Sequence, residues 1–287
     1  MYKLDSSKIQ STMKGLTPLR STLLIIISMV TVLACSTVPI TGRSQLTGLI
    51  GDQQIISMSA EAYDDVLDSV KISNDTEQVA IIRRSGTRIQ KAVEKYLADN
   101  GQSDLLEGFD WEFNLIDHNT TVNAWAMPGG KVAFYTGIMP ICQDELGVAV
   151  VMGHEVAHAV AKHGQERMNT AYAKQVGLSL GAVALGQDPS MAQRLVFQAV
   201  GIGSEIGMLA FSRKHESEAD ELELIFMAIA GYDPSEAPKF WERMSAGSGG
   251  QAPPEFMSTH PSHETRIERL NAKLPEAIEY YERSEMK

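Results

Sequence analysis

The chain has 287 residues, 44% of them hydrophobic, and carries a formal charge of −11 at pH 7 from 36 acidic and 25 basic residues. An acidic surface of this kind disfavours nucleic acid and anionic lipid headgroups as partners. The length beyond the N-terminal segment fits one compact domain with a sizeable core.

The N-terminal segment predicts export and lipidation. Thr22 to Ala34 is an uncharged run preceded by basic residues, and it is shorter than the roughly 20 residues that span a bilayer. Val32-Leu33-Ala34-Cys35 resembles a bacterial lipobox, so residues 1–34 are predicted to be a lipoprotein signal peptide and Cys35 the acylated N-terminus. Residues 35–51 would be a lipidated linker. An uncleaved anchor and a plain secretory signal remain alternatives.

A lipobox would place the protein in a bacterial cell envelope. Ser36 follows Cys35, and by analogy with Gram-negative lipoproteins a residue other than aspartate there predicts the outer membrane, with the domain facing the periplasm. Removing residues 1–34 leaves 21 basic against 35 acidic residues, a charge of −14. Membrane attachment is therefore expected to come from the lipid, since the surface offers no basic excess.

Hydrophobic periodicity predicts an α+β fold. The predicted elements are helices over residues 52–70 and 76–96, a strand over 111–116, and strands over 123–127 and 131–135. Pro128-Gly129-Gly130 supplies the turn of a β-hairpin between the last two strands. From Gln143 onward the pattern is helical. Residues 52–287 are thus predicted to be one mostly helical domain, with a small sheet against the helix described next.

The sequence His154-Glu155-Val156-Ala157-His158 is an H-E-x-x-H motif within a helical apolar pattern. At about 100° per residue, His154 and His158 share one helix face and can bind one metal ion. Glu155 lies beside that face, where it can take a proton from a metal-held water. Because two buried histidines and a buried glutamate are costly without a cation, the motif predicts a single Zn²⁺ and hydrolysis.

A third ligand is expected from the segment around Glu216. Glu216 and Asp220 are four residues apart, so both face the same way on a helix, while Glu218 points off that face. Glu216 would bind zinc and Asp220 would accept the other ring N–H of a ligand histidine. The alternative is a solvated acidic face. The apolar residues that follow, from Leu222 to Ala228, favour a packed helix.

Two further residues are assigned structural roles. His163 is five residues beyond His158, about 140° round a continuous helix, so it is expected at the helix end with Glu166 or in solvent. Cys142 is expected to be a small buried residue, and alone it cannot form an internal disulfide.

These motifs resemble a known metallopeptidase family. H-E-x-x-H followed by Arg213-x-x-Glu216-x-Glu218-Ala219-Asp220 is similar to the gluzincin family of the CAAX prenyl protease, HtpX, BepA and LoiP. The resemblance extends to residues 38–43, 123–132 and 231–234, and so covers nearly the whole chain after residue 35. It implies a gluzincin-type fold, zinc on His154, His158 and Glu216, and Glu155 as general base.

The resemblance also implies two weaker site assignments. In the family the Asn-Ala strand lies beside the zinc, so Asn123 and Ala124 are candidates for holding the substrate backbone; the alternative is that Asn123 caps a turn. Ser258-Thr259-His260-Pro261 resembles a loop that places a histidine on or near the zinc. His260 would stabilise the oxyanion or fill the open coordination position, unless it is only a turn residue.

The sequence therefore predicts a zinc endopeptidase of the cell envelope that cleaves misfolded or unassembled proteins. Its partners would be protein or peptide substrates, the membrane through Cys35, and envelope assembly machinery. A second hypothesis is an assembly factor or chaperone with a seldom-used site. The chain shows no internal repeat of the kind that scaffolding relatives carry. An exopeptidase is disfavoured because no residue is recognisable as an anchor for a terminal amine.

Overall fold

The computed structural model describes residues 35–38, 41–178, 211–246, 255–260 and 265–287. The predicted signal peptide, residues 1–34, lies outside the described residues. The main elements are β1 (Cys35–Thr37), β2 (Ser44–Leu46), α2 (Asp52–Ser69), α3 (Thr76–Asp99), β3 (Glu112–Ile116), β4 (Ala124–Met127), β5 (Lys131–Tyr135), α4 (Met139–Cys142), α5 (Glu145–Val160), α6 (His163–Leu178), α8 (Arg213–Ile229), α9 (Glu236–Ala246), α10 (Glu255–Thr259) and α11 (Arg266–Glu282), with 3-10 turns η1 (Ser103–Leu106) and η2 (Thr136–Ile138). The predicted α+β class is confirmed.

The small sheet has the order β3-β5-β4. The predicted β4–β5 hairpin is present, with Ala126 opposite Val132. Its turn uses Gly129 and Gly130 at φ +93° and +86°, a region that glycine enters without a Cβ penalty. A Cβ on Gly130 would also lie 2.7 Å from the Trp111 ring. β3 pairs parallel to β5, which leaves β4 at an edge.

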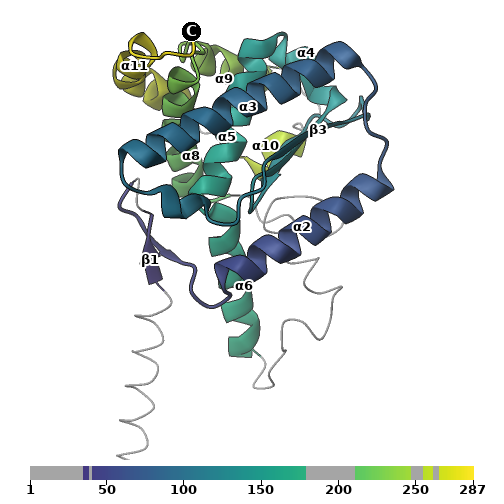
Figure 1. The fold of residues 1–287 in the computed structure, drawn as a ribbon, viewed down its shortest axis with the longest axis vertical. Helices are drawn as coiled ribbons and strands as arrows, with labels where there is room; N and C mark the ends of the chain where they lie inside the picture. Colours follow the sequence, from purple (N-terminus) through teal and green to yellow (C-terminus); the bar gives the residue numbers. More distant parts are fainter. Residues whose placement is uncertain (1–34, 39–40, 179–210, 247–254, 261–264) are drawn as a thin grey trace, which may run out of the picture.

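The helix α5 runs through the centre of the molecule and packs against α3, α8 and β4 (Figure 1). The Asp144 carboxylate caps its N-terminus by accepting from the backbone N–H groups of Leu146 and Gly147. At Gly153 a Cβ would lie 3.4 Å from the Glu223 carbonyl oxygen. The missing side chain therefore lets α8 approach α5 at the level of His154.

A two-residue interruption, Ala161 and Lys162, separates α5 from α6. Lys162 has φ +59°, a left-handed conformation that ends a helix, and α6 begins at the next residue, His163. The Lys162 ammonium group lies 2.5 Å from Asp52 Oδ2 at the start of α2. The α-helix is therefore interrupted immediately after the H-E-x-x-H segment.

The segment expected to be a linker is partly folded onto the domain. β1 and β2 pair antiparallel, and β2 packs against α6. Val38 and Ile50 are fully buried, and Asn169 Oδ1 accepts from the backbone N–H of Leu49 and of Ile50 at 2.8 Å. Apolar burial and backbone hydrogen bonds therefore hold this segment against the domain.

Among the described residues, no helix has the length and apolarity needed to cross a membrane.

Candidate metal centre and active site

Four side chains converge in the interior, two from α5, one from α8 and one from the residue that follows α10. The Nε2 atoms of His154 and His158 lie 3.1 Å apart. Glu216 Oε1 is 3.4 Å from His158 Nε2, and Glu216 Oε2 is 3.5 Å from His154 Nε2. His260 completes the group, with Nδ1 3.2 Å from Glu216 Oε1 and 3.3 Å from His154 Nε2. All four residues are buried.

This donor set fits a metal ion. The ligand atoms of His154, His158, Glu216 and His260 all lie within 4.8 Å of one another. Glu216 Oε2 is buried without a hydrogen-bond partner, and the two ligand Nε2 atoms face each other. Lone pairs gathered in a dry site need a cation to offset their desolvation and mutual repulsion. The structure thus brings together three predicted ligands and His260.

Glu155 lies beside this cluster. It is buried, its Oε1 has no hydrogen-bond partner, and His260 Nε2 is 3.3 Å from it. Burial raises the pKa of Glu155, against the lowering effect of His260, His154 and a backbone hydrogen bond from Ala126. A raised pKa suits a carboxylate that must hold a proton briefly. The bond from Ala126 also places the backbone of β4 next to Glu155.

The far side of His154 faces two carboxylates. Its Nδ1 lies 3.1 Å from Glu223 Oε2 and 3.3 Å from Asp220 Oδ1. The prediction that Asp220 lies next to a ligand histidine matches this geometry, but Glu223 is closer and sequence reasoning missed it. Its spacing from Glu216 and Asp220 is a detectable signal, since residues seven and three apart on a helix share a face. Burial of His154 lowers its pKa, but bonds to Asp220, Glu216 and Glu223 outweigh that effect and raise it.

Arg266 is a second residue that sequence reasoning missed. It is fully buried, forms an ion pair with Asp220, and its Nη1 is 3.5 Å from Glu216 Oε2. Its guanidinium carbon lies 3.2 Å from the centroid of the Trp241 ring. A buried guanidinium offsets the negative charge of the surrounding carboxylates. Nothing in the local pattern of α11 identifies this position, because the acidic groups come from α8.

The expectation for His163 is wrong. The prediction assumed a continuous helix, but the helix is interrupted at Lys162, and His163 contacts a ligand histidine. His163 is fully buried, and its Nδ1 lies 2.9 Å from His158 Nδ1, while its Nε2 lies 2.8 Å from Glu218 Oε2. Burial lowers the pKa of His163 to about 4.

Glu218 is also buried, so it is not part of a solvated acidic face. Burial raises its pKa, but hydrogen bonds from His163, Thr41 and Arg43 outweigh this and bring the value to about 2. Glu218 does point off the face of Glu216 and Asp220, as expected, and it meets the N-terminal hairpin there.

The remaining candidates lie as follows. Asn123 and Ala124 are buried at the start of β4, and Asn123 Oδ1 accepts from the Ala124 backbone N–H at 2.9 Å. This bond is local, and a role of Asn123 and Ala124 in substrate binding stays a prediction. Cys142 is buried and burial raises its pKa, so the thiol is not activated. Lipidation of Cys35 stays a prediction too.

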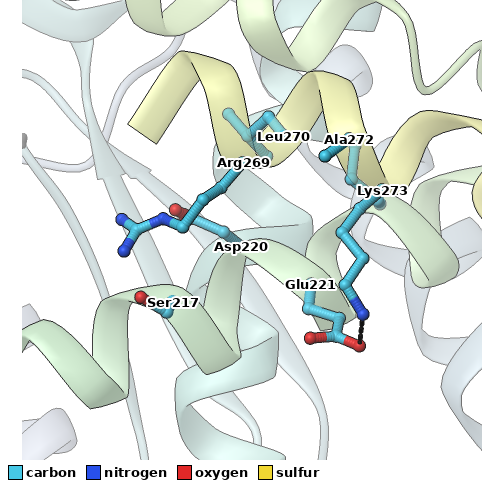
Figure 2. Close-up of a pocket in the computed structure, with 8 residues that line it drawn as sticks. Ser217, Asp220, Glu221, Arg269, Leu270, Ala272 and Lys273 are labelled. Atoms are coloured by element: carbon cyan, nitrogen blue, oxygen red, sulfur yellow. Dashed lines mark hydrogen bonds and ion pairs between the residues drawn. The ribbon is translucent and has the colours of Figure 1, made fainter. Parts of the chain in front are cut away.

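A cavity of about 190 Å³ lies between α8 and α11, on the outer side of Asp220 (Figure 2). Its walls include Ser217, Leu270 and Lys273, and the Lys273 ammonium group is paired with Glu221 at 2.5 Å. Neither Glu155 nor any of the four clustered residues lines it. It is therefore not the substrate cleft.

The fold and the site together define a class of protein. A small sheet beside a central H-E-x-x-H helix, with a glutamate from a second helix facing both histidines, is the arrangement of a zincin-like metallopeptidase.

The comparison with known families gives the same answer. Residues 84–274 match peptidase family M48, and the chain belongs to this family. The expected family resemblance is confirmed.

The chain is similar to several curated proteases. It is 38% identical over 191 residues to the mitochondrial metalloendopeptidase OMA1 of Schizosaccharomyces pombe, covering 66% of this chain and 53% of that protein. Against metalloendopeptidase OMA1, mitochondrial, of Homo sapiens it is 29% identical over 253 residues, 85% of this chain and 47% of the relative. Against the beta-barrel assembly-enhancing protease of Escherichia coli it is 28% identical over 178 residues, 59% of this chain and 36% of the relative.

The chain therefore spans about half the length, or less, of these relatives. The prediction of a zinc metalloendopeptidase is confirmed at the level of the family and of the relatives' names. Metal dependence is typical of the family, and the described residues contain a matching His and Glu cluster.

The predicted location is wrong. Several of its relatives are mitochondrial metalloendopeptidases from fungi, a plant and animals, which contradicts an outer-membrane lipoprotein facing the periplasm. The prediction depended on a short apolar run, a few basic residues and one cysteine. Short leader features of this kind occur in several kinds of targeting segment, so they do not define one compartment.

Proposed function

We propose that the protein is a zinc-dependent endopeptidase that hydrolyses internal peptide bonds of misfolded or unassembled proteins. The observation that carries the proposal is the buried convergence of His154, His158 and Glu216 with Glu155 beside them. His154 and His158 would hold the metal through Nε2, and Glu216 through its carboxylate. When bound, zinc supplies Lewis acidity toward the scissile carbonyl and the attacking water.

Glu155 is the proposed general base and acid. Its carboxylate, whose Oε1 accepts no hydrogen bond in this structure, takes a proton from the attacking water, and the same carboxyl then delivers that proton to the leaving nitrogen. The raised pKa of Glu155 supports this double role.

The edge strand β4 is the proposed site for the substrate backbone. β4 pairs with β5 on one side, and its Ala126 backbone contacts Glu155. An extended peptide added to this edge would form main-chain hydrogen bonds without demanding a particular sequence. Ala124 lies at the start of this strand, and we keep Asn123 and Ala124 as proposed substrate contacts.

His260 is proposed as a fourth residue that would hold the metal in this conformation. Its Nδ1 faces the same centre as the ligand atoms of His154 and Glu216. Substrate cleavage requires an open position, so the α10 segment would have to move His260 aside before water and peptide enter.

A pair of variants tests the proposed function. Glu155→Gln is expected to retain one zinc per chain and to lower casein cleavage by about 100-fold or more, the range for loss of a general base. The exposed Glu94→Gln serves as the matched control and should behave as wild type. Zinc is measured by elemental analysis and cleavage by released peptides. Full activity in Glu155→Gln would reject the assignment.

A second candidate function is protein assembly with limited proteolysis. It is favoured by the similarity to a relative named a beta-barrel assembly-enhancing protease. Cells that carry only the Glu155→Gln form discriminate the two: wild-type growth supports the assembly role, and loss of function supports the peptidase.

A further inference from the structure

A chain of contacting side chains connects the N-terminal hairpin, formed by β1 and β2 and the turn between them, with the metal centre. Arg43 Nε donates to Glu218 Oε2 at 2.6 Å. Glu218 Oε2 in turn lies 2.8 Å from His163 Nε2, and His163 Nδ1 lies 2.9 Å from His158 Nδ1. The sequence separations of 175, 55 and 5 residues show that only the tertiary fold assembles this chain of contacts.

The chemistry of the groups fixes the direction of each hydrogen bond. The Arg43 guanidinium only donates and an ionised Glu218 carboxylate only accepts, so His163 Nε2 must carry the proton of that contact. A neutral His163 then has a lone pair at Nδ1. His158 Nδ1 must therefore carry a proton and donate it to His163. The result is a His158 ring whose Nε2 lone pair is free and faces His154 and Glu216.

The environment holds these groups in place. His158, His163 and Glu218 are all buried, so an unpaired partner would cost free energy. Arg43 is additionally held by Glu166, with Nη1 2.7 Å from Glu166 Oε2. The hydroxyl of Thr41, on the same hairpin turn, also donates to Glu218.

We infer that Arg43 is a positioning residue for the metal centre, which fixes the tautomer and orientation of His158 through Glu218 and His163. The inference rests on the proposed zinc function. It makes a docked N-terminal hairpin a condition for tight metal binding, because undocking would remove Arg43 and Thr41 from Glu218 together.

Zinc affinity of the full chain is the direct test. The dissociation constant of Zn²⁺ is measured by competition with a chromophoric chelator, and the melting temperature of the metal-free form is measured in parallel. Arg43→Met is expected to weaken zinc binding about 10-fold to 100-fold, the range for loss of an outer partner of a ligand histidine. Arg43→Lys keeps a cation at Glu218 and should restore part of the affinity.

The control removes a comparable ion pair elsewhere. Arg243 pairs with Glu236 at 2.7 Å, and its side chain is 26% exposed against 19% for Arg43. Arg243→Met should therefore lower stability by a similar amount and leave zinc affinity unchanged.

A double variant separates positioning from packing. His163→Phe fills the same volume without ring nitrogens, and it should weaken zinc binding at least as much as Arg43→Met. Adding Arg43→Met to His163→Phe should cause no further loss, because the connection is already broken. Full additivity of the two losses would overturn the inference.

The remaining outcomes are also decisive. A wild-type chain that binds no zinc rejects the proposed function itself. A wild type that binds zinc, with Arg43→Met equal to Arg243→Met, rejects only the role of Arg43. Should Arg43→Met fail to fold, Thr41→Val decides the question, because it removes one donor to Glu218 and should weaken zinc binding several-fold; unchanged affinity there rejects the inference.

Discussion

The two ligand histidines are supported in different ways. His154 Nδ1 meets the carboxylates of Glu223 and Asp220 directly, and both come from the helix that also supplies Glu216. His158 Nδ1 meets a neutral histidine, His163, behind which Glu218 and Arg43 follow. One ligand is thus oriented by α8, and the other depends on α6 and the N-terminal hairpin. Two ligand histidines one helical turn apart are therefore oriented by different parts of the chain.

Removing the carboxylate that faces both ligand histidines should have the largest effect on zinc binding. Glu216 faces His154 and His158 at 3.5 and 3.4 Å, so Glu216→Gln is expected to weaken zinc binding by more than about 100-fold, beyond the range for outer partners. Elemental analysis after dialysis measures the loss. Retention of one zinc per chain would contradict Glu216 as a ligand.

Substitutions of the carboxylates that contact His154 should have the next largest effect on zinc affinity. Glu223→Gln leaves a carbonyl oxygen that still accepts, and is expected to cost about 10-fold in zinc affinity; Glu223→Leu removes the acceptor and should approach 100-fold. Asp220→Asn should fall between them, because it also weakens the pair with Arg266. Chelator competition gives all three values. Equal affinity across the set would place the support of His154 elsewhere.

Metal removal should have a smaller, global effect. Zinc at 100 times its dissociation constant stabilises the folded state by about 2.7 kcal/mol, which corresponds to roughly 5–10 °C in melting temperature for a chain of this size. Thermal unfolding with zinc and with excess chelator measures the shift. The shift should vanish in Glu216→Gln, and an equal shift there would indicate a different zinc site.

Substitutions at Lys162, where the helix is interrupted before His163, should have the smallest effect, and it falls on the free energy of unfolding. Lys162 has φ +59°, so Lys162→Gly is expected to change unfolding free energy by less than about 1 kcal/mol, with relief of the left-handed penalty offsetting loss of the Asp52 pair. Lys162→Val should destabilise by about 1–2 kcal/mol. Urea denaturation compares them. Equal stability of the two variants would show that the left-handed conformation at Lys162 does not lower the free energy of unfolding.

Much of the fold followed from local patterns. The helices over residues 52–70 and 76–96 and the hairpin around Pro128-Gly129-Gly130 are present close to their predicted bounds, and H-E-x-x-H and Glu216 lie on helices as expected. These features depend on periodicity, capping and turn residues within a few positions. The parallel pairing of β3 with β5 was not anticipated, because strand order depends on contacts that no short window contains.

The sequence by itself determined the chemistry of this protein. Helical spacing alone puts His154 and His158 on one helix face with Glu155 beside them, and it puts Glu216 and Asp220 on one face of another helix. Only the tertiary structure decided what surrounds that chemistry. The helix interruption at Lys162 places His163 against His158, and the packing of α11 and the N-terminal hairpin brings Arg266 and Arg43 to buried carboxylates. Such long-range pairings reflect the free-energy cost of leaving a buried charge without an opposite charge nearby.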